Sequence, residues 1–126
     1  MALDIKIVKK PDYVYVVELK GSIDTATHQQ LEDELREIIE EKTKTVILDM
    51  AGVNYISSIG IKVILVTKKT LEKMHATFSM VNLQPQIKKV LDAMRILPMI
   101  DIFDDIPEAD KYIDQIIKET IERQTT

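Results

Sequence analysis

Two adjacent serines, Ser57 and Ser58, lie at the start of a predicted helix, where a serine hydroxyl can cap the helix or be modified. A short apolar run at 46–48 and a loop precede them, and helical spacing of apolar residues follows them. Serine is a preferred N-cap because its side-chain oxygen accepts a hydrogen bond from a free backbone N–H of the first turn. These N–H groups and the aligned peptide dipoles also favour negative charge. A serine placed there can therefore carry a phosphate without loss of the helix.

The helix expected after these serines carries two apolar residues on its charged side. At about 100° per residue, one broad side is apolar and contains Ile59, Val63, Ile64, Val66, Thr67 and Leu71. Ile61 and Leu65 fall instead beside the lysines, one turn apart and in line with Ser58. Isolated apolar residues are normal on a surface, but a pair beside a special serine favours binding. We predict a docking stripe for a partner protein, made of Ser58, Ile61, Lys62, Leu65 and Lys69.

Other chemistries find less support in the sequence. A serine hydrolase needs a base beside its serine, but the chain has no Gly-x-Ser-x-Gly motif, and neither His28 nor His75 is placed for a triad. Asp49 ends a strand, as in a phosphoryl-accepting receiver domain, yet the chain opens with two adjacent strands, so we expect Asp49 to be structural. The carboxylates are scattered and no metal-binding spacing appears. We predict a binding module that is not an enzyme and needs no cofactor or metal.

Composition sets the class of protein. The chain has 126 residues, enough for one domain with a real core, and its 45% hydrophobic and 30% charged content is typical of a globular protein. Its apolar runs are too short to cross a membrane, it contains no cysteine, and its first residues lack the apolar core of a secretion signal. We expect a cytoplasmic protein. A net charge of −4 argues against direct nucleic-acid binding.

The order of predicted elements is β-β-α-β-α-β-α-β-α, an α/β fold with a mixed sheet of five strands covered by four helices. The predicted strands are 3–7, 13–19, 45–49, 76–81 and 99–103. The first predicted helix spans 26–42, and the second follows the paired serines. The third begins within 82–85, and the fourth begins at Pro107. In the fourth helix the residues expected to be buried are Tyr112, Ile113, Ile116 and Ile117. Loops at 21–25 and 50–58 would open at the carboxyl ends of parallel strands, where sites in such sheets occur.

The stretch VILDMAGVNYISSIGIKVIL resembles the signature of the STAS domain family, best known from bacterial anti-sigma factor antagonists. The Gly-Ser-Ile-Asp segment at 21–24 is similar to that family's early Gly-x-x-Asp loop, and the element order matches over about 3–121 of a single domain, 1–126. The resemblance implies that the protein binds an anti-sigma factor that is also a serine kinase, and so frees a sigma factor. Phosphorylation of a serine at the start of the central helix would end this binding, and a phosphatase would reset the cycle.

The resemblance also implies roles for individual residues. Ser58 holds the phosphoserine position, and Ile61 would face the kinase together with the rest of the docking stripe. The usual Asp-Ser-Ser-Gly cap reads Ser57-Ser58-Ile59-Gly60 here, so Ser57 is an alternative acceptor. The expected surroundings of the phosphate are Asp24, Asn54, Ser57 and Gly60, with Tyr55 beside them as a further partner contact.

Two alternatives stay open from the sequence. Asp24 is equally explained as an ordinary turn or capping aspartate. The whole domain is also explained as a scaffold member of the family, which assembles with other copies or binds a small ligand and is never phosphorylated.

Overall fold

The five predicted strands form one sheet in the order β1-β2-β3-β4-β5. The computed structural model describes the backbone of residues 3–125 and the side chains of residues 3–116, 118 and 119. β1 (Asp4–Lys10) pairs antiparallel with β2 (Val14–Ile23). β3 (Thr45–Ile56), β4 (Thr77–Val81) and β5 (Asp101–Phe103) follow in parallel. The predicted mixed α/β architecture is therefore confirmed.

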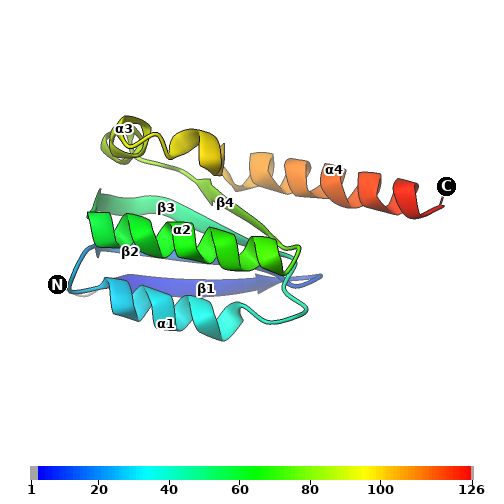
Figure 1. The fold of residues 1–126 in the computed structure, drawn as a ribbon, viewed down its shortest axis with the longest axis horizontal. Helices are drawn as coiled ribbons and strands as arrows, with labels where there is room; N and C mark the ends of the chain where they lie inside the picture. Colours follow the sequence, from blue (N-terminus) through cyan, green and yellow to red (C-terminus); the bar gives the residue numbers. More distant parts are fainter. Residues whose placement is uncertain (1–2, 126) are drawn as a thin grey trace.

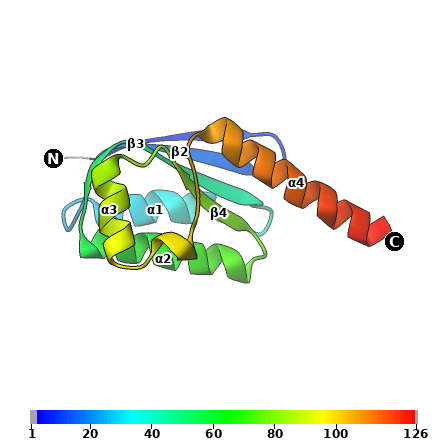
Figure 2. The same ribbon diagram turned by 90° about the horizontal axis from the view of Figure 1, so that it is seen from above.

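The helices cover the two faces of the sheet unequally. α1 (His28–Ile38) and α2 (Ser58–Lys73) lie side by side on one face, and α3 (Pro85–Ala93) follows β4. A short 3-10 turn, η1 (Leu97–Met99), precedes β5. α4 (Ile106–Thr125) crosses the opposite face and continues beyond the sheet (Figures 1 and 2). The larger core therefore lies beneath α1, α2 and α3, and a smaller one beneath the first turns of α4.

The central strands are buried on both faces because helices lie on both sides of them. Leu48 of β3 points into the larger core, whereas its neighbour Ile47 packs into the smaller one with Ala109 and Ile113 of α4. Successive side chains of a strand point to opposite faces, so both must be apolar here. This explains the uninterrupted apolar run at 46–48.

β2 and β3 are longer than the sequence indicates. β2 continues past Gly21 to Ile23, and β3 continues past Asp49 to Ile56, so most of the two predicted loops is strand. The register of the pair shifts twice, between Glu18 and Lys20 and between Gly21 and Ser22. Gly21 lies at one of these shifts, and Gly52 lies close to the backbone of Leu19 and Lys20. Neither glycine ends its strand.

The last helix differs from the prediction at one residue. Ile113 is buried as expected and Ile116 is half-buried, but Tyr112 is 38% exposed. The Tyr112 ring instead packs at the edge of the small core against Phe103, with 5.1 Å between the ring centroids and 42° between the ring planes. The side chain of Ile117, also predicted to be buried, lies outside the described residues.

Gly60 brings the first turn of α2 directly onto the ends of β2 and β3. A Cβ atom at this position would lie 2.7 Å from Ile23 Cγ2, 2.8 Å from the Ile23 carbonyl oxygen and 2.9 Å from Ile56 Cγ1. The carbonyl belongs to the backbone of the sheet and has little freedom to move. Only glycine therefore permits this contact between helix and sheet.

Replacing Gly60 by alanine should destabilise the domain, although alanine is the better helix former. The added methyl group must push α2 away from the sheet, and such overpacking costs about 1–3 kcal/mol of unfolding free energy. Urea unfolding followed by circular dichroism measures this change. Ser58→Ala, on the exposed side of the same turn, is the control and should change stability by less than about 0.5 kcal/mol. Equal stability of Gly60→Ala and wild type would contradict the close approach.

Candidate functional site

Ser57, rather than Ser58, caps α2. Its backbone is extended (φ −92°, ψ 173°), and its Oγ accepts a hydrogen bond from the Gly60 N–H at 3.4 Å. Its own N–H donates to the Ile23 carbonyl at 2.8 Å, and its carbonyl accepts from the Ile61 N–H at 3.0 Å. The prediction that the helix begins at the paired serines is confirmed. The cap bond leaves the neighbouring Ser58 as the first helical residue.

Ser58 presents its hydroxyl to solvent. The residue is exposed, whereas Ser57 is half-buried. Among the side chains that the structure describes, none forms a hydrogen bond with the Ser58 hydroxyl. Of the two predicted acceptors, Ser58 is therefore the more accessible to an incoming enzyme.

Asp24 leaves the sheet at the same place as Ser57. The residues before them, Ile23 and Ile56, are register partners in the parallel β2–β3 pair, so the two loops start side by side. Asp24 Oδ1 accepts hydrogen bonds from the N–H groups of Ala26 at 2.9 Å and Thr27 at 3.2 Å. Asp24 thus acts as the turn-forming aspartate of the alternative reading, and its carboxylate is held within its own loop.

Asn54 and Tyr55 lie near the end of β3 rather than in a loop. Both are exposed, and Tyr55 is 55% accessible to solvent. Ser22 donates its hydroxyl hydrogen to Asn54 Oδ1 across the two strands at 3.2 Å, and Ser22 is also the register partner of Tyr55. The structure therefore brings the predicted Asn54, Tyr55, Asp24, Ser57, Ser58 and Gly60 to one end of the sheet.

The predicted docking stripe is wrong at Ile61. This side chain is only 3% exposed and belongs to the larger core, while Leu65 is half-buried against that core. The buried residues of α2 include Gly60, Ile61 and Ile64, so its buried arc reaches further toward the Ile61 flank than the helical wheel suggests. Lys62 and Lys69 are exposed as predicted.

The predicted apolar side of α2 is not buried throughout. Val66, which belongs to that side, is 50% exposed at the edge facing α1. The apolar surface that α2 offers to solvent therefore lies on the α1 side and not along the Ile61–Leu65 line. Helical periodicity alone does not distinguish these two flanks.

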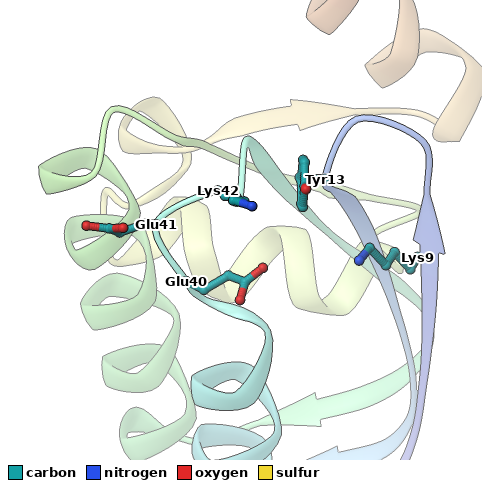
Figure 3. Close-up of a pocket in the computed structure, with 5 residues that line it drawn as sticks. All are labelled: Lys9, Tyr13, Glu40, Glu41 and Lys42. Carbon is teal, nitrogen blue, oxygen red and sulfur yellow. The ribbon is translucent and has the colours of Figure 1, made fainter.

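The opposite end of the sheet carries an open, charged depression of about 570 Å³. Lys9, Tyr13, Glu40, Glu41 and Lys42 line it, and Figure 3 shows the Glu41 side chain directed away from Tyr13. The Nζ atoms of Lys9 and Lys42 lie 5.2 and 5.8 Å from the centre of the Tyr13 ring, within range of cation–π attraction. This depression lies where β2 and β3 begin, whereas Ser58 follows the end of β3.

The described part of the chain contains no cluster of three or more His, Cys, Asp or Glu side chains suited to a metal ion. Within that part, no helix is both long and apolar enough to span a bilayer. The Ser58 end of the domain exposes the Ser58 hydroxyl, the Tyr55 ring and Lys62. Tyrosine is enriched where proteins bind one another.

Comparisons with known proteins agree with this geometry. The sequence profile of the STAS domain matches residues 5–109. A protein of Bordetella bronchiseptica named as the anti-sigma factor antagonist BtrV is 28% identical over 93 residues, which make up 74% of this chain and 80% of that protein.

Two solved structures share the fold. An anti-sigma factor antagonist from Mycobacterium paratuberculosis has a TM-score of 0.79 and 20% identity, and the match covers 89% of this chain and 94% of that one. The phosphorylated form of the Bacillus cell fate determinant SpoIIAA has a TM-score of 0.69 and 19% identity, over 90% and 99% of the two chains. With the profile matching most of its length, this chain belongs to the STAS domain family.

Proposed function

We propose that this protein is an anti-sigma factor antagonist that captures an anti-sigma factor with serine kinase activity and thereby frees a sigma factor. In this proposal the kinase phosphorylates Ser58, the complex dissociates, and a phosphoserine phosphatase restores the binding form. The observation that carries the proposal is the free, exposed hydroxyl of Ser58 at the first helical position of α2 in a STAS domain. The protein acts by binding in the cytoplasm, without catalysis or direct contact with nucleic acid.

The position of Ser58 lets a phosphate be added without refolding. Phosphorylation adds a charge of about −1.5 to −2, and the start of a helix favours an anion. Lys62 lies one turn further along and is exposed, so it shares a helix side with Ser58. The cap bond from the Gly60 N–H goes to Ser57 Oγ and does not use the Ser58 hydroxyl. The domain itself should therefore change little.

The departure from the family's cap motif affects the charge beside the phosphate. With Ser57 in place of the usual aspartate, the first turn of α2 has no acidic residue. A neutral cap makes the local potential less negative and so eases the second charge on Ser58. This supports Ser58 as an acceptor in spite of the altered motif.

The effect of the phosphate should therefore fall on the partner interface. We assign that interface to Ser58, Tyr55 and Lys62, which are exposed at or near the start of α2, and to Lys69, which is exposed about three turns further along the helix. Like charges brought together at an interface cost several kcal/mol, and each 1.4 kcal/mol or so is a factor of about ten in affinity. Electrostatic repulsion and the bulk of the phosphate are thus sufficient to separate the two proteins.

Ser58→Asp should bind the anti-sigma factor at least about tenfold more weakly than wild type, because it places a carboxylate in the interface. Isothermal titration calorimetry with the purified anti-sigma factor kinases of the same genome measures this affinity. Ser58→Ala is the control and should bind at wild-type strength. Incubation with the kinase and ATP should add one phosphate to Ser58, as located by mass spectrometry of peptides. Tight binding by Ser58→Asp together with no phosphate on Ser57 or Ser58 would overturn the switch.

Lys62 should stabilise the dianionic phosphate on Ser58. Phosphoserine placed at position 58 by genetic incorporation can be titrated by phosphorus NMR, without any kinase. Lys62→Gln removes a positive charge one turn away and should raise the second pKa of the phosphate, which is about 6 in an unperturbed phosphoserine. Lys62→Arg should preserve the wild-type value. Lys69→Gln, two turns further on, should have a much smaller effect, and an unchanged titration of Lys62→Gln would contradict the pairing.

A further inference from the structure

α1 and α2 leave an open groove of about 280 Å³ between them. Its apolar lining comes from both helices, which run side by side along the face of the sheet (Figure 1). The apolar members of the lining are Leu35, Ile39, Val63, Val66 and Met74. A space of this size admits one or two large side chains of another protein.

The groove presents apolar surface without unsatisfied polar atoms from α2. The Thr67 hydroxyl, which lies in its wall, donates to the Val63 carbonyl at 2.8 Å, and the Thr70 hydroxyl donates to the Val66 carbonyl at 2.9 Å. Both threonines are therefore satisfied within the helix. Val66, 50% exposed, forms the accessible apolar edge that an incoming side chain would cover.

The two edges of the groove differ in how their charges are balanced. On α1, Arg36 pairs with Asp33 at 3.2 Å, and Glu32 lies 3.9 Å from His28 Nδ1, which offsets the charge of Glu32 only when the imidazole is protonated. On α2 the exposed lysines on the same side as Val66 form no ion pair with any described side chain. These lysines are Lys62, Lys69 and Lys73. At about 100° per residue they lie within roughly 60° of Val66 around the helix axis. The unbalanced charge on the α2 edge of the groove is therefore positive.

We propose that this groove receives an acidic amphipathic segment of the anti-sigma factor. An apolar side chain of the segment would insert between α1 and α2 against Val66, and its carboxylates would pair with Lys62, Lys69 and Lys73. This inference rests on the proposed function and specifies the chemistry of its partner. Charge complementarity selects the occupant, since the α2 edge offers, beside an apolar groove, three lysines that pair with no side chain the structure describes.

The same surface explains how a phosphate on Ser58 would act at the interface. Ser58 lies about two turns before Val66 and on the same exposed side of α2. Its phosphate would neutralise Lys62 and repel the acidic segment that approaches the lysines. The groove supplies the apolar contact, and the serine controls the electrostatic one.

The test is a calorimetric titration of the purified anti-sigma factor kinases of the same genome into wild type and three variants. Val66→Asp should weaken binding at least about tenfold, because it places a carboxylate in the groove next to an acidic partner. Its matched control is Val90→Asp, which changes another exposed valine on α3, 39% accessible, and should bind at wild-type strength. Lys69→Ala/Lys73→Ala should bind more weakly and lose less affinity than wild type when sodium chloride is raised. Thermal unfolding of each variant verifies that it is folded.

The outcomes separate this inference from the proposed function. If wild type binds, Ser58→Asp does not, and both Val66→Asp and the double lysine variant bind at wild-type strength, the groove proposal is overturned while the antagonist function stands. If no anti-sigma factor binds wild type, both are overturned. If sedimentation shows that wild type self-associates through Val66 and the affinity for the anti-sigma factor is unaffected, the occupant is a second copy of this chain and the proposal is wrong.

Discussion

The contact between the first turn of α2 and the ends of β2 and β3 determines how the site is presented. Gly60 lies against the carbonyl of Ile23, and the N–H of Ser57 donates to that same carbonyl. One backbone oxygen thus sets both the distance and the direction of the helix start. Because it belongs to a paired strand, the position of α2 is as rigid as the sheet itself. The exposed Ser58 is therefore held by backbone contacts and not by its own side chain.

The two serines have different structural roles: Ser57 caps α2, and Ser58 is exposed to solvent. The Ser57 hydroxyl accepts from the Gly60 N–H, and Ser58 is the first helical residue, whose hydroxyl bonds to no side chain that the structure describes. An acidic residue at the cap would perform the same structural task but add negative charge beside Ser58. The serine at this position satisfies the helix while keeping its first turn free of acidic side chains. In the proposed function, a neutral cap would favour a phosphate on Ser58.

α2 combines three different environments around one axis. One arc, with Ile61, Ile64 and Leu71, is buried in the core, a second carries Ser58 and the lysines, and Val66 marks the boundary between them at the groove. Helical spacing predicts which residues share a side, but not how far neighbouring elements extend over that side. α2 contacts α1, β3 and β4, and the larger core extends to Ile61 on one flank of the helix. On the other flank, beside α1, Val66 stays exposed.

The sequence by itself determined the order of elements, the mixed sheet and the helix start at Ser57–Ser58. These follow from local rules, because alternation, helical period and capping depend on residues close together in the chain. Only the tertiary structure decided where β2 and β3 end, since Gly21 and Gly52 break the strand pattern in sequence but permit irregular pairing and close contact in the sheet. It also decided that Ser57 is the cap, that Asp24 is held in its own turn, and that Val66 rather than Ile61 is exposed. Each of these depends on which distant segment packs alongside, and no local pattern contains that information.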